Sequence, residues 1–201
     1  MPRILILFAH PRYEQSRAQR MLVEAVADLP SVTFHDLYET YPDFNVDIVR
    51  EKELLLQHDV IIWQHPFYWY SAPPLLKQWI DMVLEFGWAY GPGGTMLKDK
   101  WVCNVISSGG AQEAYQVGGK NRYPILDYLR PFEQTAYLCG MHFLPPFAVH
   151  GTHKLGDAEL DELAARYGAI VQGLAEGAFE LSELQSLKYL QELGHTNHSN
   201  A

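Results

Sequence analysis

The chain has 201 residues, of which 48% are hydrophobic, and a formal net charge of -9 at pH 7. This length and apolar content are enough to bury one core, so we expect a single domain over residues 1–194 and a disordered polar end at 195–201. The negative charge repels phosphates on average, which argues against nucleic acid as a partner. Any phosphate site must therefore be created locally.

The cysteines and the N-terminus both predict a cytoplasmic protein. Cys103 and Cys139 lie in apolar surroundings without CxxC spacing, so we expect free thiols in a reducing compartment. The apolar run at residues 4–9 is too short for a signal peptide or a membrane span.

The hydrophobic pattern predicts an α/β fold. Continuous apolar runs are typical of strands buried on both faces of a parallel sheet, whereas alternation suits an edge strand. The continuous runs occupy residues 3–9, 59–63, 101–106 and, more weakly, 143–149, and an alternating run occupies 32–37. Helical patterns occupy residues 17–28, 46–57, 74–86, 125–138 and 157–176. This order predicts a doubly wound, five-stranded parallel sheet with helices on both faces.

The loop after the first predicted strand is a candidate phosphate site. It has neither a GxGxxG nor a P-loop motif, but Ser16 stands at the N-cap of the next helix. The amides of Arg17, Ala18 and Gln19 and the positive end of the helix dipole would bind an anion there. The first twenty residues also carry four arginines and one acid. A serine that only caps the helix remains the alternative.

Three histidines lie near the predicted strand ends, and we interpret His10 differently from the other two. His10 ends the first strand and would donate to a phosphate, or would only pack. His150 and His153 have close spacing, but no further ligands accompany them, so we predict no metal site.

The loop after the third predicted strand carries four consecutive aromatic residues, Phe67, Tyr68, Trp69 and Tyr70. Neighbouring positions cannot all face one core, whereas a planar ligand can use them. We expect Trp69 to lie against an isoalloxazine ring while backbone groups of this loop bind the ring edge. A dimer or lid contact is the alternative, because aromatic residues also dominate interfaces.

Ser107, Ser108, Gly109 and Gly110 follow the fourth predicted strand. Glycine lets backbone amides approach a ligand closely, although a plain turn would have the same composition. Ligands of such sheets bind beyond the carboxyl ends of the strands. The three loops would thus bind a phosphate, the face of a planar ring and the edge of that ring, and together they predict FMN as the ligand.

Several of these segments jointly resemble the flavodoxin-like NAD(P)H:quinone oxidoreductases, over a match from Ile4 to about Tyr167. The segments are residues 9–11 with Ser16, 63–66, 69–71 and 73–77, 87–91, 107–110 and 139–140. The resemblance implies strand order 2-1-3-4-5 and FMN contacts at His10, 16–19, 67–70 and 107–110. It also implies a homodimer with the active site at the subunit boundary.

Residues 37–38, 41–45 and 144–148 resemble one bacterial branch of that family, the proteins that accompany glutathione-gated potassium-efflux transporters. The resemblance implies a potassium/proton antiporter as partner, reached from the cytoplasmic side of the inner membrane.

The resemblance also implies a reaction. In these enzymes a tyrosine and a histidine after the double glycine assist hydride transfer; Tyr115 matches the tyrosine, and Asn121 stands at the place of the histidine. We expect hydride to pass from NADH or NADPH to flavin and then to a quinone or another electrophile, in a two-electron ping-pong cycle. The amides of Gly109 and Gly110 and the Tyr115 hydroxyl would stabilise the negative charge that develops on the ring.

Two other functions remain open. Asn121 favours an FMN-binding regulatory subunit of the antiporter with little catalysis. A one-electron carrier is the second alternative, and the aromatic loop followed by the glycine-rich segment 91–94 argues against it, because both are suited to enclosing a flat substrate.

Overall fold

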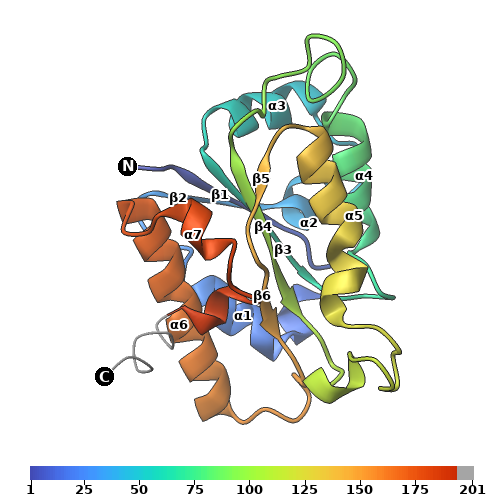
Figure 1. Ribbon diagram of the computed structural model, residues 1–201, viewed down its shortest axis with the longest axis vertical. Helices are drawn as coiled ribbons and strands as arrows, with labels where there is room; N and C mark the ends of the chain where they lie inside the picture. The colour runs from blue at the N-terminus through green and yellow to red at the C-terminus, as the bar shows by residue number, and fades with distance from the viewer. Residues whose placement is uncertain (194–201) are drawn as a thin grey trace.

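The computed structural model describes residues 1–193 and consists of one parallel sheet between two layers of helices (Figure 1). The expected disordered end at 195–201 lies outside the described residues. The strands run in the order β2 (Val32–Asp36), β1 (Ile4–Phe8), β3 (Val60–Pro66), β4 (Trp101–Ser107) and β5 (His142–Phe143). All the pairings are parallel, so the predicted order 2-1-3-4-5 is confirmed.

Helices cover both faces of this sheet, as predicted. On one face, α1 (Arg17–Glu24), α6 (Asp157–Glu176) and α7 (Leu181–Leu184) pack with alternate strand residues such as Ile4 and Ile6. On the other face, Leu5 and Leu7 pack beneath a second set of helices. That set is α2 (Leu37–Thr40), α3 (Ile48–Leu56), α4 (Pro74–Val83) and α5 (Ile125–Leu138).

The fifth predicted strand is divided in two. β5 pairs with β4 through Phe143 opposite Val102, and β6 (Phe147–Val149) pairs with the same strand through Phe147 opposite Val105. The register shows one extra residue between these pairs, as in a bulge. The division falls at Pro145 and Pro146, which have no backbone N–H to donate to the sheet.

One buried carboxylate joins three elements on the α4 face. Glu51 of α3 has no exposed surface and accepts hydrogen bonds from His35 Nε2 at 2.8 Å, Tyr41 OH at 2.6 Å and Trp79 Nε1 at 2.7 Å. Burial by itself raises the pKa of Glu51, but the bond and charge of His35 and the two other donors outweigh it and lower the pKa overall.

We expect Glu51→Gln to lower the free energy of unfolding by about 2 to 3 kcal/mol. The NH₂ group of the new side chain is itself a donor, so it would face the buried donors of His35, Tyr41 or Trp79 and leave at least one of them without an acceptor. Urea unfolding at pH 7 measures this loss. Because the pKa of Glu51 is lowered from 4.5 on folding, the charge stabilises the fold above that pH and the benefit is lost on acidification.

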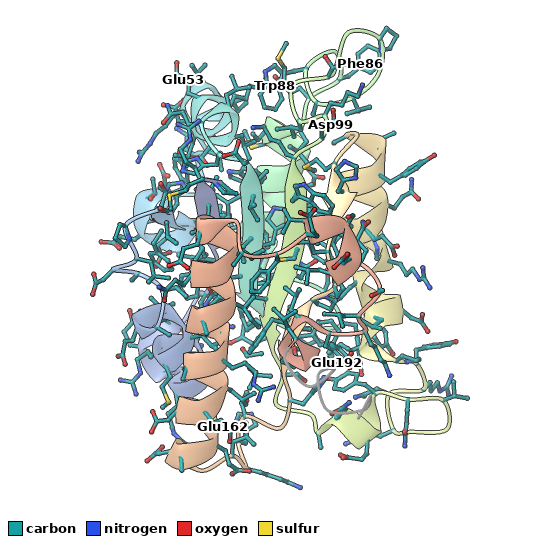
Figure 2. All side chains as sticks on the ribbon, turned by 60° about the vertical axis from the view of Figure 1, so that its left-hand side comes forward. Glu53, Phe86, Trp88, Asp99, Glu162 and Glu192 are labelled. Carbon is teal, nitrogen blue, oxygen red and sulfur yellow. The ribbon has the colours of Figure 1, made fainter. Side chains whose placement is uncertain are left out.

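Glu53→Gln is the matched control, since Glu53 is exposed on the same helix (Figure 2). It should change stability by less than about 0.5 kcal/mol. Equal losses for the two variants would contradict the role given to Glu51.

Candidate functional site

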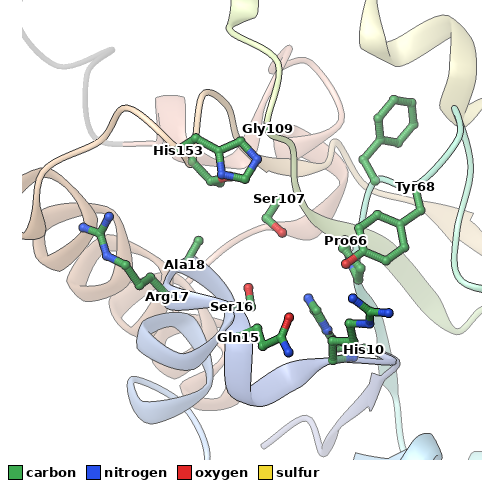
Figure 3. Close-up of a pocket in the computed structure, with 13 residues that line it drawn as sticks. His10, Gln15, Ser16, Arg17, Ala18, Pro66, Tyr68, Ser107, Gly109 and His153 are labelled. Atoms are coloured by element: carbon green, nitrogen blue, oxygen red, sulfur yellow. Dashed lines mark hydrogen bonds between the residues drawn. The ribbon is translucent and has the colours of Figure 1, made fainter.

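A cavity of about 490 Å³ lies beyond the carboxyl ends of β1, β3 and β4, where the strand order reverses (Figure 3). It brings together eight predicted site residues: His10, Ser16, Arg17, Ala18, Phe67, Tyr68, Ser107 and Gly109. Five residues that the sequence reasoning missed complete the lining: Arg12, Gln15, Pro66, Thr152 and His153. The last two directly follow β6, and that position at a strand end was the signal available for finding them.

Ser16 occupies the predicted N-cap of α1. Its Oγ accepts a hydrogen bond from the Gln19 amide at 3.3 Å, and the backbone then turns into the helix at Arg17. The Arg17 guanidinium is engaged elsewhere, because Nη2 lies 2.5 Å from Asp157 Oδ1 and 3.2 Å from the Leu155 carbonyl. The helix start thus lines the cavity at Ser16, Arg17 and Ala18, while the charge of Arg17 is shared with a neighbouring carboxylate.

His10 enters the cavity as a neutral donor. Its ring is 5% exposed, and burial lowers its pKa to about 4, so the imidazole carries no charge at neutral pH. Nδ1 accepts a hydrogen bond from the Arg12 amide at 3.1 Å, which assigns the remaining proton to Nε2. A ligand oxygen near Nε2 would accept that proton.

The aromatic loop forms a tight two-residue turn. Tyr68 and Ser71 exchange backbone hydrogen bonds of 3.1 and 3.0 Å, and the two central residues, Trp69 and Tyr70, have φ of 48° and 65°. Such a turn needs positive φ at both central positions, which large side chains rarely adopt. The loop therefore stores backbone strain beside the cavity.

The structure does not place Trp69 against a ligand-binding surface. Its side chain is 93% exposed and does not line the cavity. Tyr68 and Phe67 line the cavity instead, and Tyr70 stacks on Tyr128 with ring centroids 5.1 Å apart. The rings at the cavity are therefore those of Phe67 and Tyr68.

The glycine-rich loop is packed against its own neighbours. A Cβ on Gly109 would lie 2.7 Å from His153 Nε2, and one on Gly110 would lie 2.8 Å from the Tyr115 ring. Ser108 donates to Tyr115 OH at 3.0 Å and accepts from the Gly110 amide at 3.2 Å. A side chain at either glycine would displace one of these neighbours, and only Gly109 of this pair lines the cavity.

Asn121 holds aromatic side chains in place. The side-chain Oδ1 accepts from Tyr70 OH at 3.5 Å. The backbone carbonyl of Asn121 accepts from Tyr128 OH, and its backbone N–H donates to the Ala114 carbonyl at 2.9 Å. The imidazole ring near Tyr115 is that of His150, with centroids 5.7 Å apart. Asn121, Tyr115, Gly110, Ser108 and Gln19 therefore lie behind or beside the cavity lining.

Three further features of residues 1–193 bear on function: the thiols, the possible metal ligands and the helices that could span a membrane. Cys103 and Cys139 are free and buried, and burial raises the pKa of their thiols to about 12 and about 11. No three His, Cys, Asp or Glu side chains of these residues come together in a way that could hold a metal ion. No described helix is both long and apolar enough to span a bilayer.

A family model described as the flavodoxin-like fold matches residues 2–171. The chain belongs to this flavodoxin-like family. A member 48% identical over 167 residues, covering 83% of this chain and 91% of the relative, is the glutathione-regulated potassium-efflux system ancillary protein KefG of Pectobacterium carotovorum subsp. carotovorum (strain PC1).

Two solved structures are similar over most of this chain. General stress protein 14 from Treponema denticola, solved in complex with FMN, has a TM-score of 0.79 and 35% identity, and the match covers 89% of this chain and all of that one. An NADPH-quinone reductase from P. pentosaceus has a TM-score of 0.76 and 35% identity over 86% of this chain and 97% of that one.

The strained turn gives a prediction about stability. We expect Trp69→Asn to raise the free energy of unfolding of the monomer by about 1 kcal/mol, because asparagine tolerates positive φ and the indole is 93% exposed in a single chain. Thermal and urea unfolding would measure the gain. The control is Val117→Asn, which replaces an apolar side chain that is 85% exposed without changing a strained residue, and should have little effect. A loss of stability in Trp69→Asn would contradict the claim that the backbone is strained at Trp69.

Proposed function

We propose that this protein is an FMN-dependent NAD(P)H:quinone oxidoreductase, formed by one domain, and an ancillary activator of a glutathione-gated potassium/proton antiporter. The observation that carries the enzymatic proposal is the single cavity in which a capped helix start, two aromatic rings and a glycine-containing loop meet. The family members named above support it, since one is solved with FMN and another is named an NADPH-quinone reductase.

The lining fits a flavin nucleotide in its chemistry. The amides of Arg17 and Ala18 and the Nε2 proton of His10 suit the phosphate, whereas the Gln19 amide already donates to Ser16 Oγ. Phe67 and Tyr68 offer an apolar wall for the ring, with the backbone of residues 67–70 at its edge. The backbone of residues 107–110 lies at the carboxyl end of the neighbouring strand β4, at the same edge of the sheet.

Bound FMN would supply the two-electron chemistry, taking hydride from NADH or NADPH and giving it to a quinone. The chain's part is to bind, orient and stabilise charge. We assign the Gly109 amide and the Tyr115 hydroxyl as donors toward the ring carbonyl side, whereas the Gly110 amide donates to Ser108 Oγ and holds the loop. Ser108 orients that hydroxyl through its 3.0 Å contact.

Asn121 cannot exchange a proton at neutral pH, so we assign it to positioning of the aromatic turn through Tyr70 and Tyr128. The same observation favours a second candidate function, an FMN-binding regulatory subunit of the antiporter with little turnover. An ancillary protein of a potassium-efflux system is the role named for the relative from Pectobacterium.

We also propose a homodimer with the active site at the subunit boundary. The aromatic turn supports this, because Tyr68, which lines the cavity, and its neighbours Trp69 and Tyr70 are 41%, 93% and 47% exposed. A second subunit would cover this apolar surface. The antiporter would be reached from the cytoplasm, at the inner membrane.

The phosphate site can be tested by Ser16→Asp. Aspartate keeps the N-cap bond, but its charge opposes a phosphate at the same helix start, so we expect FMN affinity to fall by about 100-fold. Riboflavin has no phosphate, and its affinity should change by less than about threefold. Quenching of flavin fluorescence measures both. An equal effect on FMN and riboflavin would contradict the placement of the phosphate.

Steady-state kinetics test the reaction. With NADPH and a benzoquinone varied together, the proposed cycle gives parallel double-reciprocal lines and a two-electron hydroquinone product. Intersecting lines would contradict the ping-pong order. FMN binding without turnover would establish the regulatory candidate instead, and a stable blue semiquinone on photoreduction would indicate a one-electron carrier.

A further inference from the structure

Four polar side chains form a continuous chain of hydrogen bonds beneath the cavity. Tyr167 OH donates to Gln64 Oε1 at 2.9 Å, and Gln64 Nε2 donates to Gln19 Oε1 at 2.9 Å. Gln19 Nε2 then donates to Ser107 Oγ at 2.9 Å. The four residues are 1%, 0%, 0% and 7% exposed, so water does not compete for these bonds.

The residues come from four different elements: α6, β3, α1 and β4. Gln64, Gln19 and Tyr167 do not line the cavity, whereas Ser107 does (Figure 3). This series of hydrogen bonds therefore connects the middle of α6 with the cavity surface through helices and strands of the fold.

The direction of donation along this chain is set at Tyr167. If both glutamine amides were reversed, the same contacts would form with Ser107 as donor and Tyr167 as acceptor. The phenolic proton would then need another acceptor, and within residues 1–193 Tyr167 OH makes no hydrogen bond other than that to Gln64. The surroundings are apolar, with Phe147 at 5.3 Å between ring centroids. A buried donor without a partner is costly, so donation runs from Tyr167 toward Ser107.

Ser107 is consequently left with a free proton. Its Oγ accepts from Gln19, and its hydroxyl donates to no other described residue. The remaining direction is the cavity that Ser107 lines.

We propose that Tyr167 is a positioning residue that acts through Gln64 and Gln19 to fix the Ser107 hydroxyl as a hydrogen-bond donor to an acceptor atom of the bound flavin. This inference rests on the proposed FMN site. A donor whose orientation is fixed before binding needs no reorganisation when the ligand arrives.

Tyr167→Phe tests the proposal. The variant keeps the ring and removes the proton that sets the direction, so both amides can reverse and Ser107 can present a lone pair to the cavity. We expect the Kd for FMN, measured by fluorescence quenching, to rise about three- to tenfold. Gln64→Met breaks the chain at its middle and should weaken binding by a similar factor.

A double-mutant cycle with Ser107→Ala separates positioning from general damage. If Tyr167 acts through this hydroxyl, Tyr167→Phe has no further effect on the Kd once Ser107 is alanine. Tyr41→Phe is the structural control, because it removes the bond to buried Glu51 on the other face of the sheet. It should lower stability and leave the Kd for FMN unchanged.

The proposal is overturned if Tyr167→Phe and Gln64→Met both bind FMN within twofold of the unaltered protein, or if their effects persist in full in the Ser107→Ala background. Failure of the unaltered protein to bind FMN would instead overturn the proposed function, so the two failures are distinguishable.

Discussion

The candidate site depends on the parallel direction of its strands. β1, β3 and β4 end at the same edge of the sheet, so the loops at Ser16, Tyr68 and Ser107 meet although they are far apart in the sequence. The strand order reverses between β1 and β3, which opens the edge where the cavity lies. Side chains on one face of the same strands then support the cavity from below, as Gln64 does for Ser107 through Gln19.

A protein with net charge -9 can still offer a site for an anionic ligand because the donors are local and mostly neutral. His10 is uncharged at neutral pH, and the Ser107 proton has its direction set by Tyr167. The Arg17 charge is shared with Asp157. Specificity would therefore come from the direction of hydrogen bonds, which are strong in a site with little water.

The sequence predicted those features whose cause is local. The buried strands had continuous apolar runs, and the cap at Ser16 followed from the residue type before a helix. It did not predict the outward position of Trp69, which depends on two positive φ angles that the residue types disfavour. The division of the last strand had a local signal in Pro145 and Pro146 that the apolar run obscured.

Contacts between residues far apart in the sequence could not be predicted, because no local pattern of residue types accompanies them. Arg17 meets Asp157 across 140 positions, and Tyr167 meets Gln64 across 103. The lining residues Thr152 and His153 were missed although they follow a strand end, because the histidine spacing was considered only for a metal. Packing of α6 beside α1 brings Asp157 to Arg17, and packing of α6 on the sheet brings Tyr167 to Gln64.

An anaerobic absorbance titration tests the central claim most directly. The purified protein would be mixed with FMN, then with NADPH, and then with a benzoquinone. The account predicts a bound flavin whose absorbance bleaches on NADPH and recovers on the quinone. A protein that binds no FMN, or whose bound FMN NADPH never reduces, would contradict it.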